Sequence, residues 1–228
     1  MIRAVLFDVD GTLFDWETAI KRSLEAVVQH APPEDREELP ARLLRAIADY
    51  TFVRRGEAIV DRRHWLLGLD SRPPWLAALP GAPAQAAELA ERFREGLEPV
   101  AFPDARPALE ALHGEYRLAV LTNSPRGEES LVRLGLRDFF DCVVVLGADE
   151  RKPRPAAFEK GCRAVAAAPD ETMNVGDSIA NDVEGALAAG VRLVWVDRYG
   201  EPHLTPAGAQ RIESLLALPS LIAEVGGR

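Results

Sequence analysis

Asp8 and Asp10 stand directly after a short apolar run, Ala4–Phe7, and their spacing is the first in this chain that points to chemistry. Side chains alternate between the two faces of a strand, so both carboxyl groups point the same way. Two neighbouring carboxylates in a half-buried place are unfavourable unless a cation, a shared proton or a phosphoryl-transfer reaction uses them. Gly11 permits a sharp turn that brings backbone N–H groups close to an anion. The alternative interpretation is a strand that ends in a solvated Asp-Gly turn.

Further polar residues follow three later apolar runs. Thr122 and Asn123 follow one run, Lys152 follows the next, and Asp177 and Asp182 come after a third. Each group by itself has a simple structural interpretation, as a turn with a helix cap, a solvated basic patch or a helix N-cap. In an open parallel sheet, however, ligands bind where strands end and helices begin. The four groups together therefore predict one site at the carboxyl edge of a sheet.

Phosphoryl transfer uses this set of groups. Mg²⁺ prefers oxygen ligands, and Asp8, Asp177 and the backbone carbonyl of Asp10 form a suitable set. A carboxylate such as Asp8 can attack phosphorus and form an aspartyl-phosphate. Lys152 and Thr122 supply donors for the charge that develops on the phosphoryl oxygens. Asp10 is placed to give the leaving group its proton.

The strands that would position these residues are apolar runs separated by helix-compatible segments. Continuous runs rich in Val and Leu are typical of parallel strands that are buried on both faces. Their alternation with helices predicts an α/β fold with a doubly wound, Rossmann-like parallel sheet. The expected strands are Ala4–Phe7, Arg117–Leu121, Cys142–Leu146, Met173–Val175 and Val191–Val196, and the expected helices are Gly127–Leu134, Ala156–Ala167 and Ile179–Ala189.

Residues 15–99 differ, because they contain helix-compatible segments broken by prolines and no convincing strand. We expect an all-helical second domain there, inserted into a catalytic core formed by residues 1–14 and 100–228. The chain would cross between the two at Thr12–Trp16 and Pro99–Asp104. The expected helices of the insertion are Glu17–Gln29, Glu34–Arg54, Glu57–Leu67 and Pro83–Leu97, and beyond Gly200 we expect a turn and a short helix, Ile212–Leu216.

The composition argues against several classes of protein. A net charge of -9 over 228 residues disfavours a general nucleic-acid binder. The N-terminal apolar run is too short for a signal peptide or a membrane span. Cys142 and Cys162 lack the spacing of a zinc site and fit a reducing compartment. We therefore expect a cytoplasmic monomer or homodimer without nucleic-acid or membrane partners.

The four polar groups resemble the motifs of the haloacid dehalogenase superfamily. The similarity is to its phosphoglycolate-phosphatase-like branch, in which a helical cap is inserted after the first strand, and it covers the whole chain. It implies a Mg²⁺-dependent phosphatase that hydrolyses a small phosphorylated metabolite. The motifs are Asp8-Val9-Asp10-Gly11-Thr12, Leu121-Thr122-Asn123, Lys152-Pro153 and Gly176-Asp177-Ser178-Ile179-Ala180-Asn181-Asp182.

The resemblance implies a role for each of these residues. Asp8 would be the nucleophile, and Asp10 would be the general acid that later activates water. The other implied roles are phosphoryl binding by Thr122, Asn123 and Lys152, Mg²⁺ binding by Asp8, Asp10 and Asp177, and support of the site by Thr12 and by Asp182, the latter through water or Lys152.

Asp10 separates the alternatives within the family. Dehalogenating members lack an acid at this position, because a halide leaves without a proton, and they need no Mg²⁺. A sugar-phosphate mutase, which returns the phosphoryl group to its substrate, is a second enzymatic alternative. A phosphoaspartate signalling domain also combines acids, Thr or Ser and Lys on a parallel sheet, but it places its phosphoacceptor after a later strand.

A basic cluster, Arg54-Arg55 with Arg62-Arg63-His64-Trp65, stands out in the insertion. It could recognise a second anionic group of the substrate, with Trp65 or Trp16 stacked on a sugar or a base. The alternative is a charged helix face with Trp65 in the core of the insertion.

Overall fold

The computed structural model describes residues 1–42, 83–96, 98–198, 200 and 205–226. The chain divides into two compact units: Met1–Asp15 with Ala101–Arg228, and Trp16–Val100. The basic cluster between Arg54 and Trp65, the expected helix Glu57–Leu67 and most of the expected helix Glu34–Arg54 lie outside the described residues.

The first unit is built on one six-stranded sheet in the order β3-β2-β1-β4-β5-β6, in which every neighbouring pair is parallel. This topology confirms the predicted α/β fold with a doubly wound sheet. The central strand β1 lies between β2 and β4, so the strand order reverses direction there, and ligand sites form at such points. The strands are β1 Ala4–Phe7, β2 Arg117–Thr122, β3 Cys142–Val145, β4 Thr172–Gly176, β5 Arg192–Val196 and β6 Gln210–Ile212.

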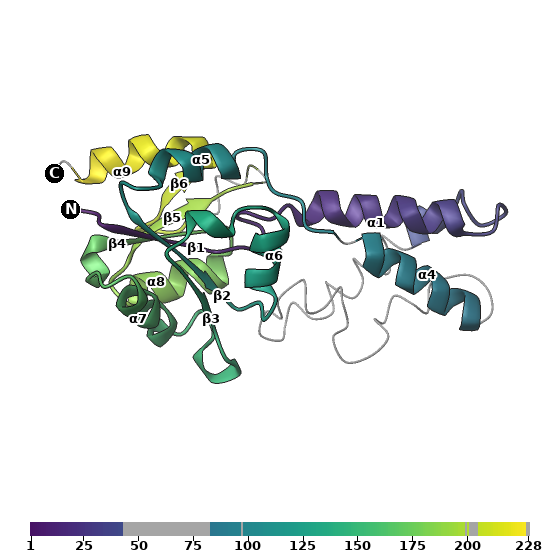
Figure 1. Cartoon of the computed structure of the whole chain (residues 1–228), viewed down its shortest axis with the longest axis horizontal. Coiled ribbons are helices and arrows are strands. Elements are labelled where there is room, and N and C mark those ends of the chain that lie inside the picture. Colours follow the sequence, from purple (N-terminus) through teal and green to yellow (C-terminus); the bar gives the residue numbers. More distant parts are fainter. Residues whose placement is uncertain (43–82, 97, 199, 201–204, 227–228) are drawn as a thin grey trace. The chain divides into compact units, whose positions relative to one another are not determined.

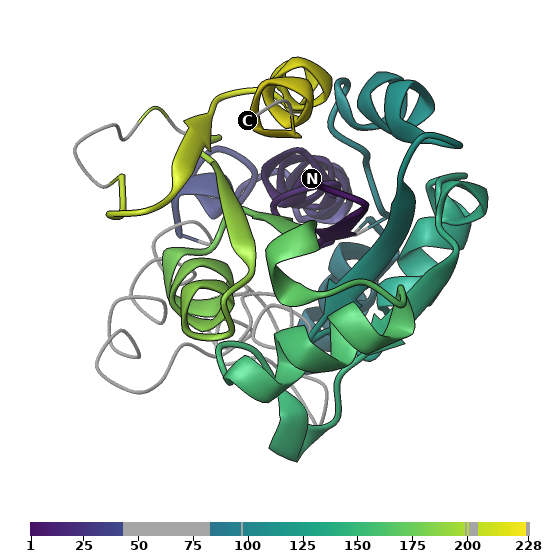
Figure 2. The same ribbon diagram turned by 90° about the vertical axis from the view of Figure 1, so that its left-hand side faces the viewer.

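Helices cover both faces of this sheet. Figures 1 and 2 show α5 and α9 over one face and α7 and α8 over the other. The helices are α5 Ala105–Leu112, α6 Gly127–Arg133, α7 Pro155–Ala164, α8 Glu184–Ala188 and α9 Leu218–Gly226, with a π-helical turn at Ile179–Val183 and 3-10 turns at Arg137–Phe139, Ala148–Glu150, Pro169–Glu171 and Leu215–Ala217.

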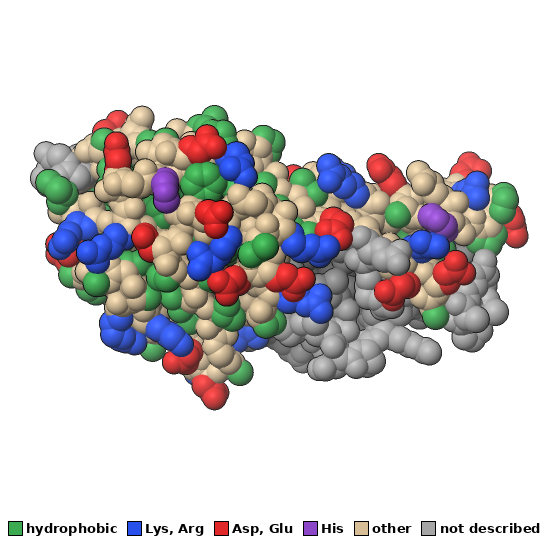
Figure 3. Space-filling view, in the orientation of Figure 1, with side chains coloured by type: hydrophobic (Ala, Val, Ile, Leu, Met, Phe, Trp, Pro, Cys, Tyr) green, Lys and Arg blue, Asp and Glu red, His purple; other side chains and the backbone are tan. Residues whose placement is uncertain are grey.

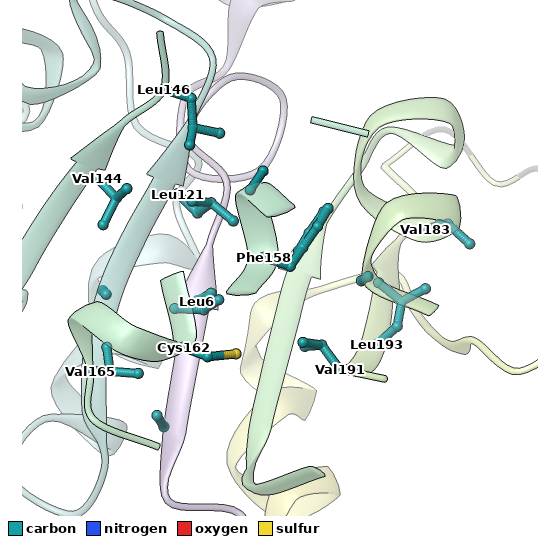
Figure 4. Packing of buried hydrophobic residues seen from close by; sticks show 14 of the residues in the cluster. Leu6, Leu121, Val144, Leu146, Phe158, Cys162, Val165, Val183, Val191 and Leu193 are labelled. Atoms are coloured by element: carbon teal, nitrogen blue, oxygen red, sulfur yellow. The ribbon is translucent and has the colours of Figure 1, made fainter. Parts of the chain in front are cut away.

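A buried hydrophobic cluster joins the sheet to α7 and α8 (Figure 4). Phe158 of α7 is fully buried and belongs to the same cluster as Leu6 of β1 and Leu121 of β2. On the opposite face, Phe7 packs edge-to-face against Phe140 with ring centroids 5.9 Å apart. Burial on both faces explains why β1 is apolar throughout rather than alternating.

The structure corrects the expected end of the chain. The predicted short helix Ile212–Leu216 is wrong, because Ile212 is the last residue of β6 and pairs with Val196. Helical structure begins only at Leu215, in a 3-10 turn that leads into α9. A three-residue edge strand has no periodicity that a sequence pattern can reveal.

Two further differences concern helices of the first unit. Helix α5 lies in a segment for which no element was expected. The expected helix Ile179–Ala189 instead begins as a π-helical turn and becomes an α-helix at Glu184. Such turns occur frequently at functional sites.

In the second unit, α1 Trp16–His30 packs against α4 Pro83–Gly96. Leu24, Val27, Leu89 and Phe93 are buried in it. Both helices agree closely with the ranges expected from the sequence. Among the described residues, no helix of either unit is long and apolar enough to cross a membrane.

Gly185 allows α8 to lie directly against the loop before α7. A Cβ atom at this position would overlap the carbonyl oxygen of Pro153 and the ring of Phe158. We expect Gly185→Ala to lower the free energy of unfolding by about 1–3 kcal/mol, measured by urea denaturation. Gly147→Ala is the control, because its Cβ would meet only Glu150 Oε2 at 3.9 Å, and its effect should stay within about 0.5 kcal/mol. Equal effects of the two substitutions would contradict this packing.

Candidate active site

The parallel register brings the polar residues to one edge of the sheet. Phe7, the last residue of β1, pairs with Val120 of β2 and with Val175 of β4. Asp8 therefore follows β1 at the level where β2 and β4 also end. Asp8 is 7% exposed, and its N–H donates to the carbonyl of Val175 at 2.9 Å, which continues the ladder by one residue.

The ammonium group of Lys152 lies at the centre of the site. Lys152 Nζ donates to Asp8 Oδ1 at 2.6 Å and to Asp182 Oδ1 at 2.7 Å. The side chains of Lys152 and Asp182 are 2% and 0% exposed. A buried ion pair is tolerated only where the geometry and additional hydrogen bonds compensate the lost solvation. The site therefore depends on this three-residue contact.

The electrostatic environment differs between Asp8 and Lys152. Burial raises the pKa of Asp8 well above its ordinary value, and Asp182, Asp177 and Asp10 raise it further against the lowering by Lys152. Burial alone would lower the pKa of Lys152, but the charges and hydrogen bonds of Asp182 and Asp8 outweigh it and raise that pKa. Lys152 is therefore charged at neutral pH, and the crowding of acids around Asp8 that raises its pKa is an environment that a bound cation would relieve.

The π-helical turn holds Asp182 in place. Ser178 accepts a hydrogen bond on Oγ from the N–H of Asn181 at 3.2 Å and donates its own N–H to Asp182 Oδ2 at 3.2 Å. Both oxygens of Asp182 are thus engaged, one by Ser178 and one by Lys152. Ser178 thus holds the Asp182 carboxylate, and Asp182 in turn holds the ammonium group of Lys152.

The loop after β1 is tightly wound. The N–H groups of Leu13 and Phe14 both donate to the carbonyl of Val9 at 2.9 Å. Gly11 has φ of +87°, and a Cβ there would overlap the Asp177 carboxylate, so this position requires glycine. Thr12 Oγ1 donates to Asp177 Oδ1 at 3.3 Å and links the loop to the end of β4.

Thr122 and Asn123 have different surroundings. Thr122 is buried, and its Oγ1 accepts a hydrogen bond from the N–H of Ser124 at 3.0 Å. Asn123 exchanges two hydrogen bonds with the backbone of Lys152: its Nδ2 donates to the carbonyl at 3.1 Å and its Oδ1 accepts from the N–H at 2.9 Å. Asn123 therefore fixes the loop that presents the Lys152 ammonium, a contact that its place in the sequence does not reveal.

Trp195 is another residue that sequence reasoning missed. Its indole N–H donates to the carbonyl of Asp177 at 2.9 Å and holds the end of β4. Trp195 belongs to an apolar run and looks like an ordinary core residue. A signal was still present, because tryptophan carries a donor that needs a partner when it is buried.

Three carboxylates form a group suited to a cation. One oxygen from each of Asp8, Asp177 and Asp182 lies within 4.8 Å of the others. Hard oxygen donors at this density suit Mg²⁺, which binds through few carboxylates and keeps several waters. Asp8 and Asp177 of the set expected from the sequence belong to this group, and Asp182 adds a third carboxylate. The third expected ligand, the backbone carbonyl of Asp10, is not a side-chain oxygen and stays a prediction. The residues present fit the cation.

The burial of Lys152 makes a measurable prediction. Lys152→Met leaves Asp8 and Asp182 buried without their cation, so we expect the free energy of unfolding to fall by about 3–5 kcal/mol in urea titrations without added metal. Lys160→Met is a matched control. Lys160 contacts Glu150 at the same 2.6 Å, but the two side chains are 37% and 52% exposed. Its loss should cost less than about 1 kcal/mol. Similar losses for both variants would show that burial does not determine the effect.

Comparison with known proteins places this geometry in a family. A family model of haloacid dehalogenase-like hydrolases matches residues 2–190. The glyceraldehyde 3-phosphate phosphatase of Pyrococcus furiosus is 31% identical over 88% of this chain and 82% of its own length. The phosphoglycolate phosphatase of Chromobacterium violaceum is 34% identical over 91% of this chain and 90% of its own.

A solved structure extends the comparison to the fold. The 2-haloacid dehalogenase of Pseudomonas syringae pv. Tomato is 30% identical and superposes with a TM-score of 0.61, covering 99% of this chain and all of that one. Phosphatases and a dehalogenase are thus both similar to this chain over most of its length. The matched residues include the four strand ends that carry the site, and the chain belongs to the haloacid dehalogenase-like hydrolase family.

Proposed function

We propose that this protein is a Mg²⁺-dependent phosphatase that hydrolyses a small phosphomonoester through an aspartyl-phosphate on Asp8. The observation that carries the proposal is the buried carboxylate of Asp8 against the Lys152 ammonium, 2.6 Å away, with a second acid, Asp10, in the same loop. The phosphatase activities named for the relatives from Pyrococcus furiosus and Chromobacterium violaceum support this class of reaction.

In the first half of the reaction, a carboxylate oxygen of Asp8 attacks phosphorus and the ester oxygen leaves. Asp10 gives its proton to that oxygen, so an alcohol departs and Asp8 carries the phosphoryl group. The charged Lys152 and the hydroxyl of Thr122 donate to the phosphoryl oxygens as negative charge builds up on them. Asn123 supports this step through its hydrogen bonds to the backbone of Lys152.

In the second half, water attacks the phosphorus of the aspartyl-phosphate. Asp10, now a carboxylate, accepts a proton from this water, and inorganic phosphate leaves with Asp8 restored. Asp8, Asp177 and the backbone carbonyl of Asp10 would hold Mg²⁺, while Asp182 and Thr12 support the set. When bound, Mg²⁺ neutralises charge on the phosphoryl oxygens and on the carboxylates.

Asp10 favours a phosphatase over a dehalogenase. Overall likeness does not separate the two, because a dehalogenase structure is 30% identical to this chain. An alcohol is a poor leaving group without a proton, whereas a halide needs none, so an acid two residues after the nucleophile is useful to a phosphatase and not to a dehalogenase. A sugar-phosphate mutase would use the same acid, but it would yield an isomerised sugar phosphate without free phosphate.

Residues 15–99 are proposed as a helical cap that supplies substrate contacts, with residues 1–14 and 100–228 as the catalytic core. The proposed substrate is a small phosphorylated metabolite, and the proposed setting is cytoplasmic, as a monomer or homodimer without nucleic-acid or membrane partners. The net charge of -9 supports the absence of a nucleic-acid partner. On the face of the first unit shown in Figure 3, Lys and Arg are interspersed with Asp and Glu.

The roles of the two acids are tested by Asp8→Asn and Asp10→Asn. In Mg²⁺, we expect phosphate release from a panel of sugar phosphates, nucleoside monophosphates and phosphoglycolate to vanish in Asp8→Asn. Asp10→Asn should fall by about 10²–10⁴-fold, since it loses general acid–base catalysis. Asp170→Asn, at an exposed position just before the amino end of β4 and so at the opposite edge of the sheet from the site, is the control and should match the parent. Equal phosphate release by Asp8→Asn and the parent would overturn the assignment, and halide release from 2-haloacids without metal would favour the dehalogenase.

Metal binding is tested by thermal unfolding. A ligand that binds only the folded state at about 100 times its Kd stabilises by about 2.7 kcal/mol, which for a chain of this size raises Tm by about 5–10 °C. We expect Mg²⁺ to produce such a shift in the parent and in Asp170→Asn but not in Asp177→Asn. An equal shift in Asp177→Asn would place the cation elsewhere.

A further inference from the structure

Arg198, which follows β5, joins three separate parts of the first unit. Its side chain is 7% exposed. Nη2 donates to the backbone carbonyl of Thr12 at 2.6 Å, and Nη1 donates to Asp104 Oδ2 at 2.7 Å. The guanidinium also lies over the ring of Phe102, 3.9 Å from its centroid. One arginine therefore contacts both the segment that leaves the first unit and the segment that returns to it.

Asp104 anchors this arginine to the C-terminal part of the chain. Besides Arg198, its Oδ2 accepts the hydroxyl of Ser214 at 2.7 Å and the N–H of Leu215 at 2.9 Å. Although burial opposes it, these hydrogen bonds lower the pKa of Asp104 below its ordinary value. Asp104 therefore stays ionised at neutral pH and holds Arg198 in a defined orientation.

Arg198 acts at the exit of the loop that carries Asp10. Hydrogen bonds to the carbonyls of Val9 and Phe14 hold this loop together internally. Its exit is held by the returning segment, through the N–H of Phe102 to the carbonyl of Leu13 at 3.0 Å, and by Arg198 on the carbonyl of Thr12. The hydroxyl of Thr12 in turn donates to Asp177. A displacement of the Thr12 backbone would therefore affect both Asp10, in the same loop, and Asp177, which belongs to the carboxylate group.

We propose that Arg198 is a positioning residue for the reaction: through the Thr12 carbonyl it fixes the loop of Asp10 at the distance needed for proton transfer to the leaving group. This inference rests on the proposed function, because it assumes that Asp10 is the acid. A displacement of about 1 Å at a reacting group can lower a rate by about 10²-fold. The sequence offered no hint of this role, since Arg198 lies outside the four motifs.

Lysine cannot replace Arg198 in this role. The two contacts diverge from the two Nη atoms of a planar fork that also stacks on Phe102. Lysine keeps the charge but lacks the planar fork, so an ammonium group paired with Asp104 is not expected to reproduce the divergent contact with the Thr12 carbonyl and the stacking on Phe102 together. Arg198→Lys therefore separates the position of the loop from the charge of the ion pair.

The test measures kcat/KM of Arg198→Lys in Mg²⁺ with phenyl, p-nitrophenyl and 2,4-dinitrophenyl phosphate, whose leaving groups need a proton to a decreasing degree. We expect kcat/KM to fall about 10–100-fold for phenyl phosphate and much less for the dinitrophenyl ester, with the loss in kcat rather than KM. Asp10→Asn should show the same dependence on the leaving group, more strongly.

Arg106→Lys is the matched control. Arg106 also donates to a loop carbonyl, that of Gly135 at 2.7 Å, and lies over an aromatic ring, 5.4 Å from the centroid of Phe139, but it is remote from the site. Its kcat/KM should stay within about twofold of the parent for all three esters, as surface substitutions usually change little. If Arg198→Lys does not fold, Asp104→Asn replaces it under the same criterion.

Two results would overturn the inference. A loss of the same size for all three esters would show that Arg198 only stabilises the fold, and unchanged kinetics would show that the Thr12 contact is irrelevant. The parent and Asp10→Asn identify the failure of the proposed function. If the parent releases no phosphate, or if Asp10→Asn is insensitive to the leaving group, Asp10 is not the acid and the inference falls with that assignment.

Discussion

The site depends on the burial of one positive charge. Lys152 Nζ lies 2.6 Å from Asp8 and 2.7 Å from Asp182, and the three side chains are almost entirely out of solvent. A charge in this environment is tolerated only if its partners stay at hydrogen-bond distance. The end of β1, the loop before α7 and the π-helical turn must therefore converge on the same point. Much of the local architecture serves this convergence, including the hydrogen bonds of Asn123 to the Lys152 backbone and the close approach that Gly185 allows.

The reaction and the scaffold are specified by different features. Phosphatases and a dehalogenase are both similar to this chain over most of its length. Under the proposed mechanism, attack by a carboxylate is compatible with either chemistry, so the scaffold alone does not select the reaction. The proposed distinction is the fate of the leaving group, which would depend on the Asp10 loop. Its winding around Val9 and its contacts with Arg198 and Phe102 are therefore the part of the fold most directly tied to the choice of reaction.

Much of the fold was predictable, and the edge strand β6 shows one reason why the rest was not. Strands such as β1 and β2 are recognisable because burial on both faces demands unbroken apolar runs. The edge strand β6 has three residues and gains its stability from pairing with β5, so its own pattern says little. Hydrophobic periodicity in a sequence indicates which face of a helix or strand is buried. It cannot identify an element that is too short to complete a period.

The sequence by itself determined which side chains stand at each strand end, because alternation and apolar runs are local properties. It thereby identified the acids, the lysine and the hydroxyl of the candidate site. Only the tertiary structure decided how they pair: Lys152 between Asp8 and Asp182, Asn123 on the Lys152 backbone, and Asp182 beside Asp8 and Asp177 in the carboxylate group. These contacts join residues up to 144 positions apart. Their distances follow from sheet register and helix packing, and no local pattern in the chain encodes a separation in space.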